Sequence, residues 1–286
     1  MRAWLGIGLS VLALVGWGLG DFFIQRTARL VGVWASLLLL SGIGTLALLP
    51  AAAPALVAAL GDHSQWPPLA LSALIACVSA PVNFLALRRG KISVVSPIIA
   101  LELPLTVALS IAIGREQLSP LQIGLILAVF TGMMLASAST ATRLERGAAL
   151  AFFSAFGLAA SNFLIGKNSQ DISPMLALLV TYAALTMEAL TALLFQRRIK
   201  RLLFQVRAHW RLIIALGAAD VTAWVGYALA TTFIPIAVAI TISESYVALA
   251  VLLGLLVNRE QLRLRQRIGI TLAVGGVIIL AAVTGT

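Results

Sequence analysis

Five acidic side chains stand inside long apolar stretches of the sequence, where a charge is costly. They are Asp21, Glu102, Glu188, Asp220 and Glu244. A charge at the centre of a bilayer costs about 2.5 kcal/mol or more. No lysine or arginine lies at a comparable depth in these stretches. Carboxyl groups without a basic partner are suited to binding a proton or a cationic group.

Glu102 and Glu244 are the strongest candidates among these acids. Glu102 lies between Pro97 and Pro104. Proline frees backbone carbonyls, and broken helices favour cavity walls. Glu244 stands in the polar segment 241–246. We predict that both glutamates bind substrate and couple protons; the alternative is a protonated structural glutamate that is hydrogen-bonded to a neighbour.

The other three acids have stronger structural alternatives. Asp21 lies near a helix end with Arg26 close by, so an interfacial ion pair competes with a role in a site. Asp220 falls in the first third of its stretch, where partial exposure is the alternative. Glu188 is expected at the periphery, in a structural role or at an oligomer interface. Asp21 and Asp220 complete the proton-coupling candidates.

Neutral polar and aromatic side chains complete the predicted substrate site. Asn83 and Tyr227 lie 144 residues apart, at equivalent positions of a repeat described below. Trp17 and Trp224 could stack on a flat or cationic substrate, although tryptophans in membrane proteins more often mark interfaces. The predicted substrate-binding residues are Trp17, Asn83, Glu102, Asn162, Trp224, Tyr227, Glu244 and Tyr246.

The stretches that position these side chains read as transmembrane helices. Apolar residues make up 61% and charged residues 10% of the chain, whose mean hydropathy is +1.05. An average soluble domain has about 25% charged residues. Residues 51–67 are too broken by proline to span and are expected along one interface, and 196–211 form the longest polar link. The fold class is all-α integral membrane, with ten predicted spans at 4–24, 31–50, 69–87, 92–113, 120–139, 147–166, 174–195, 211–231, 234–256 and 267–284.

The chain carries one unit twice. Arg115-Glu116-Gln117-Leu118 recurs as Arg259-Glu260-Gln261-Leu262, an offset of 144 residues. Around the first span the match is Asp21 with Asn162, and the counterpart of Glu102 is Tyr246. Each half holds five spans, so the second half enters the membrane from the opposite side. This predicts two inverted five-helix repeats, 1–141 and 146–286, with a substrate site between them near mid-membrane.

Basic residues are distributed unevenly between the two predicted faces. Arg2, Arg115 and Lys167 lie on the face of the termini, and the other 17 of the 20 lysines and arginines lie on the opposite face. The positive-inside rule then places both termini outside. The Arg-Glu pairs at 115–116 and 259–260 are expected as turn and helix-end ion pairs on opposite faces.

Other functional classes find little support. The net charge of +10 is explained by short basic links between spans better than by nucleic-acid binding. The single cysteine, Cys77, excludes a disulfide within the chain. Both histidines lie in links, and we find neither a Walker motif nor a Ser-His-Asp or metal-ligand spacing. We therefore expect no enzyme, no metal and no cofactor.

The sequence resembles the drug/metabolite transporter superfamily, specifically its ten-helix EamA-type members. The resemblance covers essentially the whole chain and implies a central cavity lined mainly by the spans 4–24, 69–87, 92–113, 147–166, 211–231 and 234–256. Two features depart from the family: Ser245 and Tyr246 follow Glu244 where a proline is common, and the family usually has cytoplasmic termini. The motifs that carry the resemblance are Trp17-Gly18 to Asp21-Phe22 with its echo Ser161-Asn162, Leu101-Glu102-Leu103-Pro104, Gly114-Arg115-Glu116 and Asn258-Arg259-Glu260.

The expected function is a secondary transporter that exports a small metabolite by alternating access, either proton-coupled or facilitative. The alternatives are a multidrug or lipid-like flippase, and a non-transporting membrane scaffold subunit. A scaffold has no need for five buried carboxyl groups. The expected partners are a small-molecule substrate, the lipid bilayer and protons, with no nucleic acid. The chain is expected in the inner cell membrane as a multi-pass monomer or homodimer.

Overall fold

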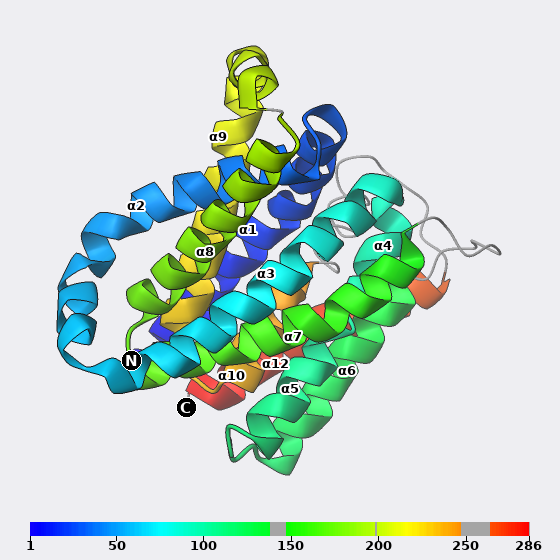
Figure 1. Cartoon of the computed structure of the whole chain (residues 1–286). Helices are drawn as coiled ribbons and strands as arrows, with labels where there is room; N and C mark the ends of the chain where they lie inside the picture. Colours follow the sequence, from blue (N-terminus) through cyan, green and yellow to red (C-terminus); the bar gives the residue numbers. More distant parts are fainter. Residues whose placement is uncertain (138–146, 198, 247–263, 286) are drawn as a thin grey trace.

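The computed structural model describes residues 1–137, 147–197, 199–246 and 264–285, which are all-helical without strands. Figure 1 shows the helices gathered into one bundle with both termini at the same end. Their bounds are α1 Arg2–Leu30, α2 Val33–Gly61, the 3-10 turn η1 His63–Gln65, α3 Trp66–Arg89, α4 Ile92–Ile99, α5 Glu102–Ala112, α6 Pro120–Ser137, α7 Ala148–Asp171, α8 Pro174–Phe195, α9 Ile199–Ala230, α10 Ile236–Glu244 and α12 Leu264–Gly285.

The predicted membrane architecture is confirmed. Eight stretches of helix are long and apolar enough to cross a membrane, and α6 is a shorter apolar helix. The span predicted at 234–256 begins as α10, while its residues 247–256 lie outside the described part of the chain. Large apolar side chains such as Leu46 and Phe153 are exposed on the outside of the bundle, as expected of a surface that faces lipid.

Two segments are more helical than the sequence predicted. The helix expected to end near residue 50 continues through Pro50 and Pro54 to Gly61, because its far end is buried: Ala59 packs against α3 and α8. Figure 1 shows α2 curving along this stretch, as prolines inside a helix dictate. The link expected at 196–211 is helical from Ile199, with a kink at His209.

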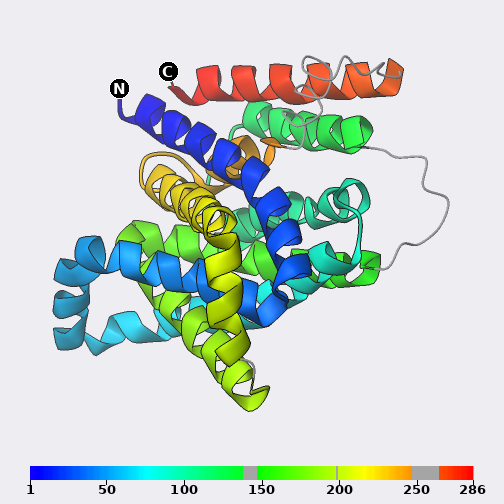
Figure 2. The ribbon, with the colours of Figure 1, turned by 90° about the horizontal axis from the view of Figure 1, so that it is seen from above.

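Equivalent helices of the two repeats pack against each other closely. Helices α6 and α12 carry Gly132 and Gly276 at equivalent positions, 144 residues apart, and lie side by side at one edge of the bundle (Figure 2). Their backbones touch through glycines: a Cβ on Gly132 would lie 2.6 Å from the carbonyl oxygen of Gly269. Small residues permit such close approach between membrane helices.

The same internal symmetry relates two further helix pairs. A Cβ on Gly16 of α1 would lie 2.7 Å from Cβ of Ala223 in α9. A Cβ on Gly157 of α7 would lie 2.5 Å from Cβ of Ser79 in α3. Gly157 is the counterpart of Gly16, and Ala223 is the counterpart of Ser79. The structure thus has the two inverted repeats that were predicted.

Candidate functional site

Both halves contain a helix that breaks in the middle of the bundle. Between α4 and α5 the amides of Leu101 and Leu103 donate to carbonyls three residues back, at 3.2 Å each. Pro104 has no N–H, so the carbonyl of Ala100 cannot receive its ordinary helical bond. The break leaves Glu102 in the first turn of α5, buried and 6% exposed.

The second break occurs at the equivalent position without a proline. Helix α10 ends at Glu244, and the amide of Ser245, the counterpart of Leu101, donates to Ile242 three residues back at 3.3 Å. The Ser245 hydroxyl donates to the same carbonyl at 2.7 Å, which offers the backbone an alternative to the helical bond. The absence of the family's usual proline therefore does not remove the break.

The two breaks place Glu102 and Glu244 close together, both on the wall of one cavity. Two buried carboxyl groups this close repel each other when both are ionised, which favours a proton on one of them. Asn162 of α7 donates from Nδ2 to Oε2 of Glu102 at 3.2 Å. Glu244 is 3% exposed. The pair is thus enclosed, and one half of the chain supplies each member.

Asp21 connects three elements beside this pair. Its Oδ2 accepts from the hydroxyl of Ser96 in α4 at 2.7 Å and from the hydroxyl of Tyr246 at 2.9 Å. The expected competitor, an ion pair with Arg26, is not among its contacts within the described residues. Asp21 therefore faces the interior of the bundle.

Asp220 forms a separate acidic position. It is buried in α9, and its Oδ2 accepts a short hydrogen bond from the hydroxyl of Tyr182 in α8. The alternative of partial exposure is wrong because α8 packs over this part of α9. Tyr182 was not among the predicted site residues.

An aromatic cluster lies between α1 and α9. The rings of Trp17 and Trp224 meet edge to face, with centroids 5.3 Å apart. Tyr227 packs against both, and its hydroxyl donates to the carbonyl of Asn162 at 2.9 Å. This arrangement places the two tryptophans inside the bundle rather than at a membrane interface.

The four acids and the two tryptophans described above line one cavity of about 120 Å³. A water molecule needs about 10–15 Å³ of such space, so several waters or a small solute would fit. The cavity walls come from α1, α2, α3, α4, α5, α7, α8, α9 and α10. Helices α2 and α8 were not expected in the lining, but Leu37 and Tyr182 among others bring them there.

The lining is acidic and otherwise apolar or neutral. Asp21, Glu102, Asp220 and Glu244 all face it, whereas no lysine, arginine or histidine does in the part of the chain that the structure describes. Two buried oxygens beside it have no hydrogen-bond partner among the described residues: Oδ1 of Asn83 and Oε2 of Glu244. An acceptor without a donor marks a place where a ligand or water can bind.

The predicted site residues are brought together with one exception. Trp17, Asn83, Glu102, Asn162, Trp224, Glu244 and Tyr246 line the cavity, as do Asp21 and Asp220. Tyr227 is fully buried behind the tryptophans and does not line it. Glu188 does not line the cavity.

Tyr182 could have been found from its residue type. The chain has three tyrosines, and all of them are buried within the bundle with a bonded hydroxyl. A tyrosine inside an apolar span needs a partner for its hydroxyl. Tyr182 falls in the predicted span 174–195, so its hydroxyl was expected to need an acceptor on a neighbouring helix.

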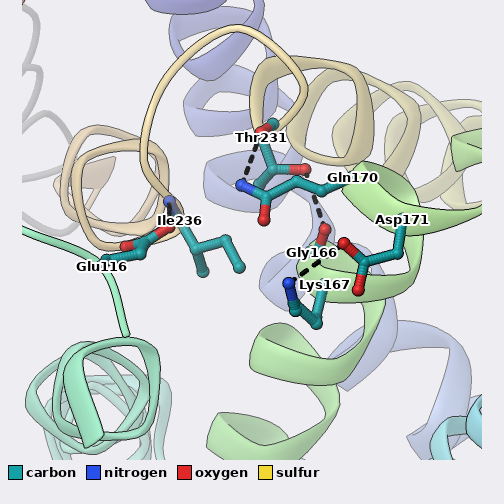
Figure 3. A network of polar contacts seen from close by, with 7 residues as sticks. All are labelled: Glu116, Gly166, Lys167, Gln170, Asp171, Thr231 and Ile236. Carbon is teal, nitrogen blue, oxygen red and sulfur yellow. Dashed lines mark hydrogen bonds and ion pairs between the residues drawn. The ribbon is translucent and has the colours of Figure 1, made fainter. Parts of the chain in front are cut away.

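A second set of polar contacts joins the link before α6, the last turn of α7, the end of α9 and the start of α10 (Figure 3). The carboxylate of Glu116, in the link before α6, accepts from the amides of Ile236 and Ala237 at 2.5 and 3.0 Å. Beside it, Gln170 donates to the carbonyl of Thr231 at 2.9 Å, and Lys167 pairs with Asp171. The helix-end role expected for Glu116 is thus made with the start of α10 and not with Arg115. Its repeat mate Glu260 lies outside the described residues.

Comparison with known proteins identifies the family of this chain. A family model described as the EamA-like transporter family matches residues 4–138 and again residues 145–282. No curated protein matches the chain significantly. Among solved structures 28 chains match. One of them, titled "Crystal structure of protein", is 16% identical with a TM-score of 0.72, over 99% of this chain and 96% of its own. At this identity the likeness shows the fold.

Proposed function

The chain belongs to the EamA-like transporter family of membrane transporters for small solutes, and we propose that it exports a small metabolite by proton-coupled alternating access. The observation that carries this proposal is the pair of Glu102 and Glu244, which lie together on the cavity wall where α4 passes into α5 and where α10 ends. Two related halves around a fixed site can open to either face with similar energy.

The coupling follows from competition for the same carboxyl groups. A substrate that needs the carboxylate form of the glutamate pair can bind only after the pair has released a proton. One carrier then binds either protons or substrate, which is the condition for exchange. In a cell with an inward proton gradient, this exchange drives the substrate outward.

The closed end of the bundle supports a gate on the face of the termini. Glu116 ties the link before α6 to the start of α10, and α10 carries Glu244 at its other end. Opening this face requires that the carboxylate release the amides of Ile236 and Ala237. The nine-residue helix α10 thus connects Glu244 at one end to the bonds with Glu116 at the other.

The test is transport by the purified full-length protein in liposomes, screened with amino acids, nucleosides and cationic drugs. Glu102→Gln and Glu244→Gln keep the shape of the side chains but cannot titrate. Both variants should lose the dependence of transport on the pH gradient, while exchange at equal pH survives. Glu102→Ala and Glu244→Ala should weaken exchange as well.

Glu188→Gln is the matched control, because Glu188 is an acid of the same bundle that does not line the cavity. It should transport like the unmodified protein. If both glutamine variants at 102 and 244 retain full gradient-driven transport, the glutamates are structural and the proton-coupled mechanism is wrong.

A further inference from the structure

We propose that the substrate is a small organic cation with an ammonium-type head and an apolar body. This inference rests on the proposed transport function and names the chemical class of its substrate. It assigns the head to the acidic lining of the cavity, and in particular to Asp220 and Glu244. The glutamate pair then exchanges a proton for one positive charge on the substrate.

The charge of the lining selects against anions. Four carboxyl groups from four elements, at positions 21, 102, 220 and 244, face a space of about 120 Å³. No basic side chain of the described residues lines that space. A carboxylate or phosphate in such an enclosed, poorly solvated site would meet repulsion without a compensating partner.

The unpaired atoms give a second and independent indication. Oδ1 of Asn83 and Oε2 of Glu244 are both oxygens, in side chains that are 9% and 3% exposed. Each is an acceptor that finds no donor within the described residues. A ligand that satisfies them must therefore bring N–H or O–H groups, and an ammonium group brings three donors and no acceptor.

The remaining walls suit an organic body better than a bare metal ion. Apolar side chains such as Leu37, Leu40 and Ile165 line the cavity together with the acids. Trp17 and Trp224 add an aromatic wall, and aromatic rings attract organic cations. A hydrated inorganic ion would leave these apolar walls in contact with its water.

Asp220 is the position best suited to hold the head group. Its Oδ2 is held by the Tyr182 hydroxyl, which fixes the orientation of the carboxyl group. Asp220 and Glu102 have different hydrogen-bond partners, so Asp220 adds a further carboxyl group for the head once the glutamate pair has released its proton. Tyr182 acts here as a positioning residue.

The test is equilibrium binding to the purified full-length protein in detergent, measured by calorimetry. The probes are two matched series: phenethylamine, phenethyl alcohol and phenylacetate, and butylamine, butanol and butyrate. The amine of at least one series should bind about tenfold more tightly than its alcohol, because a charged hydrogen bond is the difference between them. The carboxylates should not bind measurably.

Variants assign the binding to this cavity. Asp220→Asn and Glu244→Gln should each weaken amine binding about tenfold. Tyr182→Phe keeps the carboxyl group of Asp220 but removes its hydrogen bond, so it should weaken amine binding less. In the double variant with Asp220→Asn, Tyr182→Phe should cause no further loss. Glu188→Gln should bind as the unmodified protein does. If Asp220→Asn fails to fold, the Glu244→Gln and Tyr182→Phe results together with the amine-to-alcohol ratio still decide.

The inference is wrong if no amine binds better than its alcohol, or if Asp220→Asn and Glu244→Gln both leave amine binding unchanged. Its failure is distinct from a failure of the proposed function. If the protein transports a neutral or anionic solute in liposomes and binds no amine, the cationic substrate class is wrong and the transport function stands. If amines bind but are never transported across the membrane, the transport function is wrong and the cation-binding site stands.

Discussion

Two equivalent contacts on either side of the cavity have opposite chemistry. Asn162 of α7 donates to Glu102, whereas its repeat mate Asp21 of α1 accepts from Tyr246, the mate of Glu102. Each contact joins the first helix of one half to the broken helix of the other. Both halves thus have this hydrogen bond, but the acid is on the broken helix in one contact (Glu102) and on the first helix in the other (Asp21).

The comparison extends to the other acids of the cavity. With the offset of 144 residues, Asp220 matches Ala76 and Glu244 matches Ala100. Ala76 lines the same cavity as Asp220. The packing of this transporter therefore follows the repeat, and the chemistry of its site lies at the positions where the two repeats differ.

The most direct way to break the comparison is to test whether the halves are inverted. Arg88 and Thr232 are exposed residues at equivalent positions of the two halves. In a background with Cys77→Ala, a membrane-impermeant maleimide should label Thr232→Cys from outside intact cells. It should label Arg88→Cys only after the cells are opened, an all-or-none difference.

Labelling of both cysteines from the same side would contradict the inverted arrangement. Labelling on opposite sides with the assignment reversed would keep the repeats but overturn the orientation inferred from the Lys and Arg count. A reporter fused after Thr286 that works only in the cytoplasm should be silent, and it provides an independent control of that orientation.

The close helix contacts allow a sharper comparison of the halves. Gly157→Ala should destabilise the protein by about 1–3 kcal/mol, since the new Cβ would lie 2.5 Å from Cβ of Ser79. Gly16→Ala should cost a similar amount, because it meets Cβ of Ala223 at 2.7 Å and the carbonyl of Ala219 at 2.8 Å. Thermal unfolding in detergent measures both.

Rescue distinguishes the two sites. Ser79→Gly should restore most of the stability of Gly157→Ala, whereas Ala223→Gly should only partly restore Gly16→Ala, because the carbonyl of Ala219 remains in place. Gly8→Ala on α1 is the control: its Cβ meets nothing within 4 Å, and alanine should stabilise the helix by about 0.5–1 kcal/mol. If Ser79→Gly and Ala223→Gly restored the same fraction of the lost stability, the predicted difference between the two contacts would be wrong.

The sequence predicted the repeat and the acids for a physical reason. Apolar side chains are needed wherever a helix faces lipid, so spans such as 4–24 and 69–87 could be identified from hydropathy. The duplication showed that Glu102 and Tyr246 occupy equivalent positions in the two halves. A carboxyl group in an apolar span has so few acceptable surroundings that Asp21 and Asp220 could be assigned to the interior as one alternative.

The remainder depended on contacts between distant segments. Pro50 and Pro54 argue locally for a break, but burial of Ala59 against α3 and α8 keeps α2 helical. The pairing of Tyr182 with Asp220 joins helices whose order around the cavity was unknown from the sequence. The same holds for Glu116, whose partners are amides 120 residues away rather than the neighbouring Arg115.

The two equivalent ties should differ in strength. Asn162→Ala leaves Oε2 of Glu102 buried without its donor and should cost about 1–2 kcal/mol in the free energy of unfolding. Tyr246→Phe should cost only about 0.6 kcal/mol, because Asp21 keeps the hydroxyl of Ser96. Ser154→Ala, whose hydroxyl bonds only within its own helix, should change little. A larger loss for Tyr246→Phe than for Asn162→Ala would contradict the proposed difference.

The last prediction concerns the end of the bundle where the termini lie. Glu116→Gln should cost about 0.5–1 kcal/mol, because the side chain loses one of its two acceptor oxygens and the charge that favours a helix N-terminus. Asp171→Asn, which breaks only the exposed pair with Lys167 on the same face, should cost at most about 0.5 kcal/mol. Because α10 links this cap to Glu244, the rate of maleimide labelling at Thr231→Cys, which is buried while this face is closed, should also rise about two- to fivefold in Glu116→Gln, as a loss of that size shifts the opening equilibrium. Equal labelling rates in Glu116→Gln and Asp171→Asn would mean that the cap stabilises α10 without holding this face closed.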